Sequence, residues 1–538
     1  MINTNGTYMP SNNNAPQMIS VSFSKWIKYP VDINPTMNVN AGPSIGGVGI
    51  TCRYPFIPKI RNTPPKNQYA SLVKLIAFLP EALASWKGYS LILYFFKQIV
   101  QPVPFCRLVS RLLILSYTRL MSIEIEWTEE LKHAYSVMQS SDPIVMITGA
   151  AGTGKSTLLY HFRLNTNKQC IVLAPTGIAA IQVKGETIHS FLKLKPGMTL
   201  ADVKLKASRL RSTALYDSIE TIIIDEISMV RADLMDMMDV FLKAARKDSR
   251  PFGGIQMIMI GDFCQLPPVV SREEQAHFFQ RYSSSYVHAS DLFRQFDFDY
   301  TELVLTEVFR QRDEDFIRLL TCIRGGDVSR DVLETLNTRV VPTAVEEGVV
   351  LLTSTNAQAD TANLQQLSRI SGESQIYMAT MDGQSSDRTA PAPAELILKE
   401  GAQIIFLVND GMGGRFMNGT IGRVLRLLPD TIVVEVPNRG IIQVTRHTWK
   451  LFHYDVDATT HNLIQKEVGS YTQFPIKLAW AITIHKSQSQ TFDRVHVDFG
   501  RGLFAAGQAY VALSRCRTFE GLTLARALKA SDFQITAR

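Results

Sequence analysis

The stretch that most constrains this chain runs from Pro143 to Leu159 and reads PIVMITGAAGTGKSTLL. Its apolar run is typical of a buried strand, its glycines predict a loop, and the residues after Lys155 predict a helix. This is the G-x-x-x-x-G-K-S pattern in the strand, loop and helix order that phosphate binding requires. Backbone N–H groups in such a loop, together with the helix N-terminus, point at phosphate oxygens. The segment therefore predicts a nucleoside triphosphate site.

Each residue of the loop has an expected role. Lys155 would reach the β- and γ-phosphates, and Ser156 would offer its hydroxyl to Mg²⁺. We assign nucleotide binding to Gly149, Ala150, Ala151, Gly152, Thr153, Gly154, Lys155, Ser156 and Thr157. A chance match to the pattern is a small risk, and the flanking strand and helix make it smaller.

Further apolar runs at 170–174, 221–224 and 255–260 predict more strands of a parallel sheet, because helix-length segments separate them. Each run is followed by polar residues, and ligands gather at the carboxyl ends of parallel strands. Directly after the run at 221–224, Asp225 would hold Mg²⁺ through water and Glu226 would orient or deprotonate the attacking water. The alternative is a merely solvated strand end, which the upstream phosphate loop disfavours. Ser156 and Asp225 are thus the predicted metal ligands.

Charge is unevenly distributed along the chain. The first 120 residues contain twelve Lys and Arg against Asp32 and Glu81, a net charge of +10, so a total of +7 leaves −3 for the rest. We interpret residues 1–120 as a leader that is disordered or poorly packed, and three interpretations stay open: a targeting or interaction leader, an accessory helical region, or sequence upstream of a working protein that starts at Met121. Because residues 121–538 carry net negative charge, a nucleic-acid site in that part of the chain must be a local patch of basic residues. The six cysteines have no C-x-x-C spacing, which favours a reducing compartment over a disulfide framework.

Several motifs occur in one order along the body of the chain. They are GAAGTGKS at 149–156, APTGIAA at 174–180, GETIHSF at 185–191, IDEISMV at 224–230, PFGGI at 251–255, GDFCQLPPV at 261–269, LTEVFRQ at 305–311, TN at 355–356, MNGT at 417–420, FPIKLAWAITIHKSQ at 474–488 and QAYVALSR at 508–515. With these motifs the chain resembles the petite-integration-frequency (PIF) DNA helicases, relatives of RecD in superfamily one, group B. The resemblance extends from about Glu126 to about Leu524.

The resemblance implies an α/β fold of two RecA-like P-loop domains. The first would span 121–300, with a wedge at about 190–216 that splits the duplex. The second would span 301–400 and 474–530, interrupted at 401–473 by a small SH3-like β-barrel, and a tail would follow at 531–538. Short β-branched runs broken by Asn, Gly and Pro between 403 and 444 independently allow such a barrel.

The resemblance also implies a mechanism in which ATP binds between the two domains. Its catalytic residues would be Lys155, Asp225, Glu226, Gln265, Arg310 and Arg515. Gln265 would sense the γ-phosphate, and the two arginines would reach it from the second domain when the cleft closes. An isolated arginine is more often a surface ion pair, but the motifs favour the catalytic role.

Single-stranded DNA and DNA forks are the implied partners. The strand would be held by Thr176, His189, Thr355, Asn356, His485 and Lys486. An isolated histidine is more often structural than functional, and here the motifs reverse that preference. We expect a monomer without membrane association, located in the cytoplasm or nucleoid of a prokaryote, or in the nucleus or mitochondria of a eukaryote.

Two positions depart from the family pattern. Family members carry a glutamine that reads adenine in the helix predicted after Thr128, and Leu131 stands there, so preference for ATP is open. A glycine normally follows His-Lys-Ser-Gln, and Ser489 stands there, with an expected effect on the coupling of hydrolysis to stepping. The expected activity is 5′→3′ DNA unwinding in replication, repair or recombination. The alternatives are a P-loop kinase or small-molecule NTPase, and a DNA-stimulated ATPase without strand separation.

Overall fold

The computed structural model describes residues 127–533 except 196, 296–298, 312, 342–345, 384–389, 411–413, 489, 501 and 504. The predicted leader, Ser489 and most of the tail lie outside the described residues. Within the described part, no helix is both long enough and apolar enough to cross a membrane.

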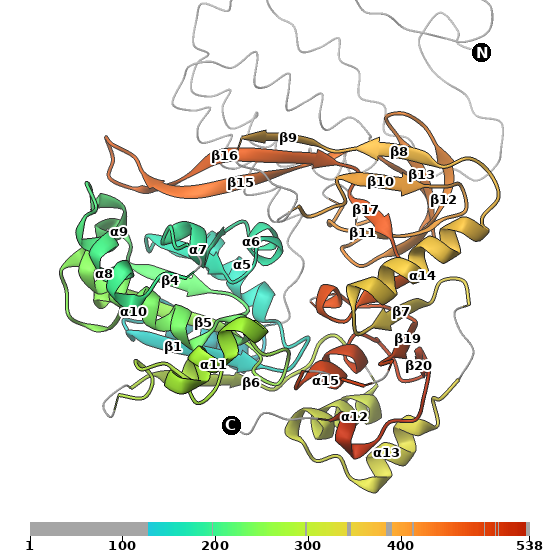
Figure 1. The fold of residues 1–538 in the computed structure, drawn as a ribbon, viewed down its shortest axis with the longest axis horizontal. Helices are drawn as coiled ribbons and strands as arrows, with labels where there is room; N and C mark the ends of the chain where they lie inside the picture. Colours follow the sequence, from blue (N-terminus) through green and yellow to red (C-terminus); the bar gives the residue numbers. More distant parts are fainter. Residues whose placement is uncertain are drawn as a thin grey trace, which may run out of the picture. The chain divides into compact units, whose positions relative to one another are not determined.

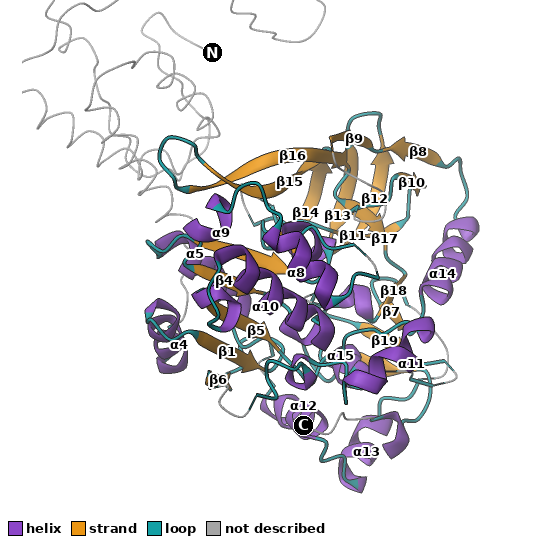
Figure 2. Ribbon diagram, turned by 60° about the vertical axis from the view of Figure 1, so that its left-hand side comes forward, coloured by secondary structure: helices purple, strands orange, loops and turns teal. Residues whose placement is uncertain are grey.

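The first lobe is a parallel sheet with helices on both faces (Figures 1 and 2). Its strand order is β3-β2-β4-β5-β1-β6. The strands are β1 Ile144–Gly149, β2 Cys170–Ala174, β3 Glu186–Thr187, β4 Thr221–Ile224, β5 Gln256–Gly261 and β6 Thr301–Leu305. The helices are α4 Glu129–Gln139, α5 Lys155–Asn165, α6 Gly177–Gln182, α7 Ile188–Phe191, α8 Leu200–Ser208, α9 Ala214–Ser218, α10 Ala232–Arg246 and α11 Arg272–Arg281.

Alternation along the strands explains why this sheet is covered twice. In β1, Ile144 and Met146 join the apolar cluster beneath α8 and α10, whereas Val145 and Ile147 join the cluster beneath α4 and α5. Side chains of a strand point alternately to the two faces, so a run of apolar residues needs a helical layer on each side. The predicted parallel sheet is confirmed.

One predicted boundary is corrected. We expected the second domain to begin near Thr301, but β6 pairs with β1 in parallel, from Thr301 opposite Val145 to Leu305 opposite Gly149. The strand closes the edge of the first sheet, and Glu130 fastens its end by accepting the Thr306 N–H at 2.8 Å. The second lobe therefore starts after Leu305.

The second lobe has a parallel sheet of order β18-β7-β19-β20. Its strands are β7 Val350–Thr353, β18 Ala481–Thr483, β19 Val495–Asp498 and β20 Leu522–Leu524, and its helices are α12 Glu314–Gly325, α13 Arg330–Asn337, α14 Asn356–Arg369 and α15 Gln508–Leu513. A separate apolar cluster, which includes Val350, Ile482, Val497 and Leu522, forms its core.

Antiparallel strands occupy the chain between α14 and β18. A sheet of order β14-β13-β12-β11-β17 contains β11 Gln403–Phe406, β12 Ile421–Leu427, β13 Ile432–Val436, β14 Gly440–Val444 and β17 Ile476–Leu478. The remaining strands are β8 Gln375–Met378, β9 Thr380–Gly383, β10 Glu395–Leu398, β15 His447–Val456 and β16 Leu463–Gln473. Strands occur in each predicted β-branched run, and the SH3-like class of this sheet stays a prediction.

The predicted wedge at 190–216 contains α8, the end of α7 and the start of α9, joined by turns and loops. Thr199 caps α8 with a capping box that includes Asp202, and Val203 and Ala207 of this helix are buried in the first-lobe core. The segment is thus anchored to the sheet domain, and its action on a duplex stays a prediction.

Candidate nucleotide and strand-binding sites

The phosphate loop joins β1 to α5 as predicted. Gly152 and Gly154 have φ values of 89° and 84°, a region that side chains other than glycine rarely adopt. A Cβ at Gly152 would lie 2.4 Å from the Arg310 Cβ, so glycine also allows the Arg310 segment to approach the loop. These features form a backbone cradle that a phosphate group fits.

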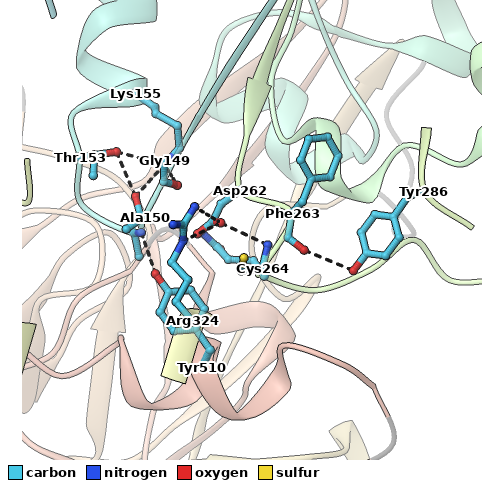
Figure 3. Close-up of polar contacts among 12 residues, drawn as sticks. Gly149, Ala150, Thr153, Lys155, Asp262, Phe263, Cys264, Tyr286, Arg324 and Tyr510 are labelled. Carbon is cyan, nitrogen blue, oxygen red and sulfur yellow. Dashed lines mark hydrogen bonds and ion pairs between the residues drawn. The ribbon is translucent and has the colours of Figure 1, made fainter. Parts of the chain in front are cut away.

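Lys155 lies within this cradle (Figure 3). Its ammonium donates to the carbonyl oxygens of Gly149 and Ala150, each at 2.8 Å. Burial lowers the pKa of Lys155, while the charges of Asp262 and Glu226 oppose that shift. A triphosphate would supply the anionic partner that a buried ammonium requires.

Asp225 and Glu226 follow the buried strand β4. The Glu226 N–H donates to the Asp225 carboxylate at 3.0 Å, and Glu226 has the left-handed backbone angles φ 54° and ψ 47°. Burial, followed by the charge of Glu226, raises the pKa of Asp225 to about 7, and Lys155 opposes this. Two carboxyl groups with different environments are the arrangement that separates a metal ligand from a base.

The donor set fits a magnesium ion that arrives with a nucleotide. Ser156 stands in the first turn of α5 and offers a hydroxyl, and Asp225 offers a carboxylate. No group of three or more His, Cys, Asp or Glu among the described residues forms a metal site of its own. Mg²⁺ keeps several waters and is typically bound through one or two carboxylates plus substrate phosphates.

Sequence reasoning missed the residue that organises the next strand end. The Asp262 carboxylate is fully buried and accepts a hydrogen bond from the Arg324 guanidinium at 3.2 Å (Figure 3). It also accepts one from Gln265 Nε2 at 3.1 Å. It thereby fixes Gln265, the predicted γ-phosphate sensor. The position of Asp262 directly after β5 was a usable signal, whereas Arg324 lies in α12 outside every motif.

The second lobe touches the phosphate loop through α15, and Tyr510 was also missed. The Ala151 N–H donates to the Tyr510 hydroxyl at 3.1 Å, and burial is the main reason that the pKa of Tyr510 is raised. At the start of α15, a Cβ on Gly507 would lie 2.4 Å from the Gln265 carbonyl oxygen. The two lobes therefore meet at the predicted nucleotide site.

Both predicted arginine fingers lie within electrostatic reach of Glu226. Arg310 Nη1 is buried without a hydrogen-bond partner among the described residues, and burial lowers the pKa of Arg310. Arg515 is buried, and its guanidinium donates to the carbonyl oxygens of Val511 at 2.9 Å and Ser487 at 3.3 Å. Burial, followed by the charge of Arg310, lowers the pKa of Arg515 to about 9, and Glu226 and Asp262 act against that shift. Two desolvated cations thus lie within electrostatic reach of first-lobe carboxylates.

Two of the six residues predicted to bind DNA, Thr176 and Thr355, occupy equivalent places in the two lobes. Thr176 follows β2 and caps α6, and Thr355 follows β7 and caps α14, each hydroxyl accepting from a backbone N–H. Asn356 and Lys486 line one groove of the second lobe. His189 lies in α7 and His485 lies in η7 (His485–Ser487), and burial lowers the pKa of both, which favours neutral rings.

Leu131 packs against the phosphate loop. It is buried in α4, which Thr128 caps as predicted, and a Cβ at Gly154 would lie 3.5 Å from its side chain. An aliphatic side chain without hydrogen-bonding atoms therefore stands beside the loop, and base preference stays an open prediction.

Fold and site together define a P-loop protein with two RecA-like lobes. Residues 126–333 match the family model described as PIF1-like helicase. The chain is 35% identical over 390 residues to the mouse ATP-dependent DNA helicase PIF1, which covers 70% of this chain and 57% of the mouse protein. It therefore spans little more than half the length of that relative.

Bacterial relatives are covered more completely. The chain is 32% identical to the ATP-dependent DNA helicase Pif1 of Bdellovibrio bacteriovorus over 74% of this chain and 88% of that protein. Unliganded Pif1 from Bacteroides sp superimposes with a TM-score of 0.69 at 34% identity, over 77% of this chain and 95% of that chain. That Bacteroides protein has also been solved with ADP-AlF4 and bound to ssDNA. The chain belongs to the PIF1-like helicase family.

Proposed function

We propose that this chain is an ATP-dependent DNA helicase that translocates 5′→3′ on single-stranded DNA and unwinds duplexes at forks. The observation that carries this proposal is the meeting of the two lobes at the phosphate loop, where Arg310 and Arg515 stand within electrostatic reach of Glu226. A site divided between two bodies couples the state of a bound nucleotide to their separation.

The nucleotide side of the mechanism uses residues from both lobes. Bound Mg²⁺ would neutralise phosphate charge, held by Ser156 and Asp225. Glu226 would orient the attacking water and accept its proton. Gln265, held by Asp262, would contact the γ-phosphate. Arg310 and Arg515 would stabilise the negative charge of the transition state, and Arg515 must leave its backbone acceptors to do so.

The proposed DNA-binding surface consists of helix-capping residues and cationic side chains rather than groups that read bases. Thr176 and Thr355 begin helices that follow equivalent strands, so their backbone N–H groups are suited to phosphates. His189, Asn356, His485 and Lys486 would complete the track. Contacts of this kind grip a strand regardless of sequence. The Bacteroides relative has been solved bound to ssDNA, which supports single-stranded DNA as the ligand of this track.

The remaining expectations are part of the same proposal. The segment 190–216 would separate the DNA strands, and the antiparallel sheet between α14 and β18 would be the SH3-like domain. One chain contains both walls of the nucleotide site, so a monomer suffices for hydrolysis. We propose a location where the chain meets DNA, in the nucleoid, the nucleus or mitochondria according to the cell.

One experiment separates the helicase from its alternatives. ATPase turnover would be measured with and without single-stranded DNA, and unwinding would be followed on duplexes with a 5′ or a 3′ tail. We expect stimulation by DNA and unwinding from the 5′ tail. The matched control is Arg515→Ala, which should bind ATP and lose turnover. DNA-stimulated hydrolysis without unwinding would favour the ATPase alternative, and hydrolysis indifferent to DNA would favour the kinase or small-molecule class.

A further inference from the structure

A groove of about 320 Å³ lies on the second lobe between α14, β10 and the β17–β18 segment. Its α14 wall consists of residues spaced three and four apart, which form one face of the helix. They are Asn356, Ala359, Asp360, Asn363, Leu364 and Leu367. Figure 1 shows α14 beside the strands of the antiparallel sheet. The groove is lined by α14 and β18 of the parallel-sheet part of the second lobe and by β10 and β17 of its antiparallel part.

Two lysines line the groove near the start of α14, and the Asp360 carboxylate lies within electrostatic reach of Lys477. Lys477 lies on β17 and Lys486 in η7, and both line the groove together with Asn356 from the first turn of α14. Within the described part of the chain, neither lysine ammonium makes a hydrogen bond or an ion pair. The N-terminus of α14 adds its partial positive charge at the same end. Two unpaired ammonium groups and a helix N-terminus are suited to an anion.

The strand pattern explains why Lys477 faces the groove. Its neighbour Ile476 points into the core of the antiparallel sheet, so Lys477 points to the other side. Burial, followed by the charge of Lys486, lowers the pKa of Lys477 to about 8, and Asp360 opposes this. Glu395 on β10 is the other charged group that lines the groove. A lysine held in this way gains a proton readily when an anion arrives.

The other walls of the groove are apolar. Leu364 and Leu367 of α14 face Leu396 and Ile397 of β10, and Leu364 is 59% exposed. An exposed leucine opposite further aliphatic side chains offers a surface for the flat face of a ring. The groove thus combines an anion site with an apolar slot, as sites for small organic ligands do.

We propose that this groove binds one nucleotide of the translocated strand, with its phosphate between Lys477 and Lys486 and its base against Leu364 and Ile397. The inference rests on the proposed function and deepens it, because Lys477 and the apolar slot were absent from the expected track. A nucleotide fits better than a peptide, since the two cations and the apolar wall match the two chemical ends of a nucleotide.

The charge end is tested by binding of a fluorescent oligo-dT, followed by anisotropy at several salt concentrations and pH values. Lys477→Gln should weaken binding and lower the salt slope by about 0.7 to 1, the value for one lost phosphate contact. The matched control Lys247→Gln, at the exposed end of α10, should change neither.

The pH dependence distinguishes a phosphate contact from a structural role. An ammonium with a pKa near 8 is largely neutral at pH 9 in the free protein, and a bound phosphate raises that pKa. Affinity of the unchanged chain should therefore fall about tenfold from pH 7 to pH 9, because binding must take up a proton. Lys477→Arg stays charged and should bind with little change over that range. Equal pH dependence in both proteins would overturn the proposal.

The apolar end is tested by Leu364→Gln, which is exposed enough to leave folding intact. We expect about threefold weaker binding at every salt concentration with an unchanged salt slope. Ile441→Gln, which is 68% exposed on β14, is the control. If the chain without substitutions binds no single-stranded DNA, the proposed function itself is wrong. If it binds DNA and the Lys477 and Leu364 variants bind equally well, only the groove proposal is wrong.

Discussion

In the predicted water-activating pair, Glu226 has a strained backbone and burial shifts the pKa of Asp225. Glu226 holds a left-handed backbone that costs a residue with a side chain roughly 1 kcal/mol or more, and Asp225 is kept partly protonated near neutrality by burial. Such costs persist where the surroundings fix them, and they cluster at functional sites. The D-E sequence indicated the chemistry, but neither the strained backbone nor the altered pKa could be inferred from it.

The raised pKa of Asp225 predicts a pH dependence of catalysis. Below pH 7 the free protein holds Asp225 increasingly protonated, so the carboxylate proposed to bind magnesium is lost. The kcat/KM for Mg-ATP should fall about tenfold between pH 7.5 and pH 6, measured in buffers of constant ionic strength. A profile that stays flat down to pH 5 would contradict this.

The same shift predicts a stability effect without nucleotide. The folded pKa of about 7 lies above the unfolded value of about 3.9, so folding binds a proton between these values and stability falls as pH rises from 4 to 7. Asp225→Asn removes that cost and should raise the free energy of unfolding at pH 8 by up to about 4 kcal/mol, while abolishing turnover. At pH 4 the gain should disappear, which is the internal control.

At the scale of elements, the β15–β16 hairpin joins two lobes that are distant in sequence. The Val172 N–H of β2 donates to the Tyr454 hydroxyl at 2.9 Å, beyond the end of the short strand β3. The Tyr454 N–H donates to the buried Glu186 carboxylate at 3.2 Å, and His453 lies 3.0 Å from the Ser190 hydroxyl. Burial raises the pKa of Glu186, and Ser190 and His453 oppose this. The hairpin therefore provides a hydrogen-bond acceptor for a β2 backbone N–H that β3 does not reach.

This docking predicts the effect of Tyr454→Phe. The change leaves the Val172 N–H buried without an acceptor, which should lower the free energy of unfolding by about 1 to 2 kcal/mol in urea denaturation. Thr448→Val removes the exposed hydroxyl pair with Thr472 on the same hairpin and should cost less than about 0.5 kcal/mol. Equal effects of the two changes would show that the tyrosine contact is not specific.

For the whole molecule, closure of the two lobes depends on one glycine. Gly507 has φ +70° and lies so close to the first lobe that a Cβ would meet the carbonyl oxygens of Gln265 at 2.4 Å and Cys264 at 2.5 Å. Any side chain here must push α15 away from the phosphate loop, and Tyr510 and Arg515 would move with that segment.

Gly507→Ala should therefore reduce the ATPase kcat by roughly ten- to a hundredfold, because a displacement near 1 Å misplaces the catalytic groups. ATP binding, measured with a fluorescent analogue, should persist because the first lobe still holds the phosphates. Gly440→Ala is the matched control: it has φ +81° and nothing within 4 Å, so it pays the backbone cost without the clash. Similar losses of turnover in both variants would attribute the effect to backbone strain alone.

Features that depend on neighbouring residues were predictable from the amino-acid sequence: the phosphate loop, the strands around it, the Thr128 cap and the order of the family motifs. Four features became known from the folded chain: β6 belongs to the first sheet, Arg324 and Asp262 form a buried pair, Tyr510 contacts the phosphate loop, and Lys477 faces a groove. The physical reason is range. Propensity and periodicity act over a few residues, whereas these contacts join residues 60 to 360 positions apart, for which a local pattern carries no distance information.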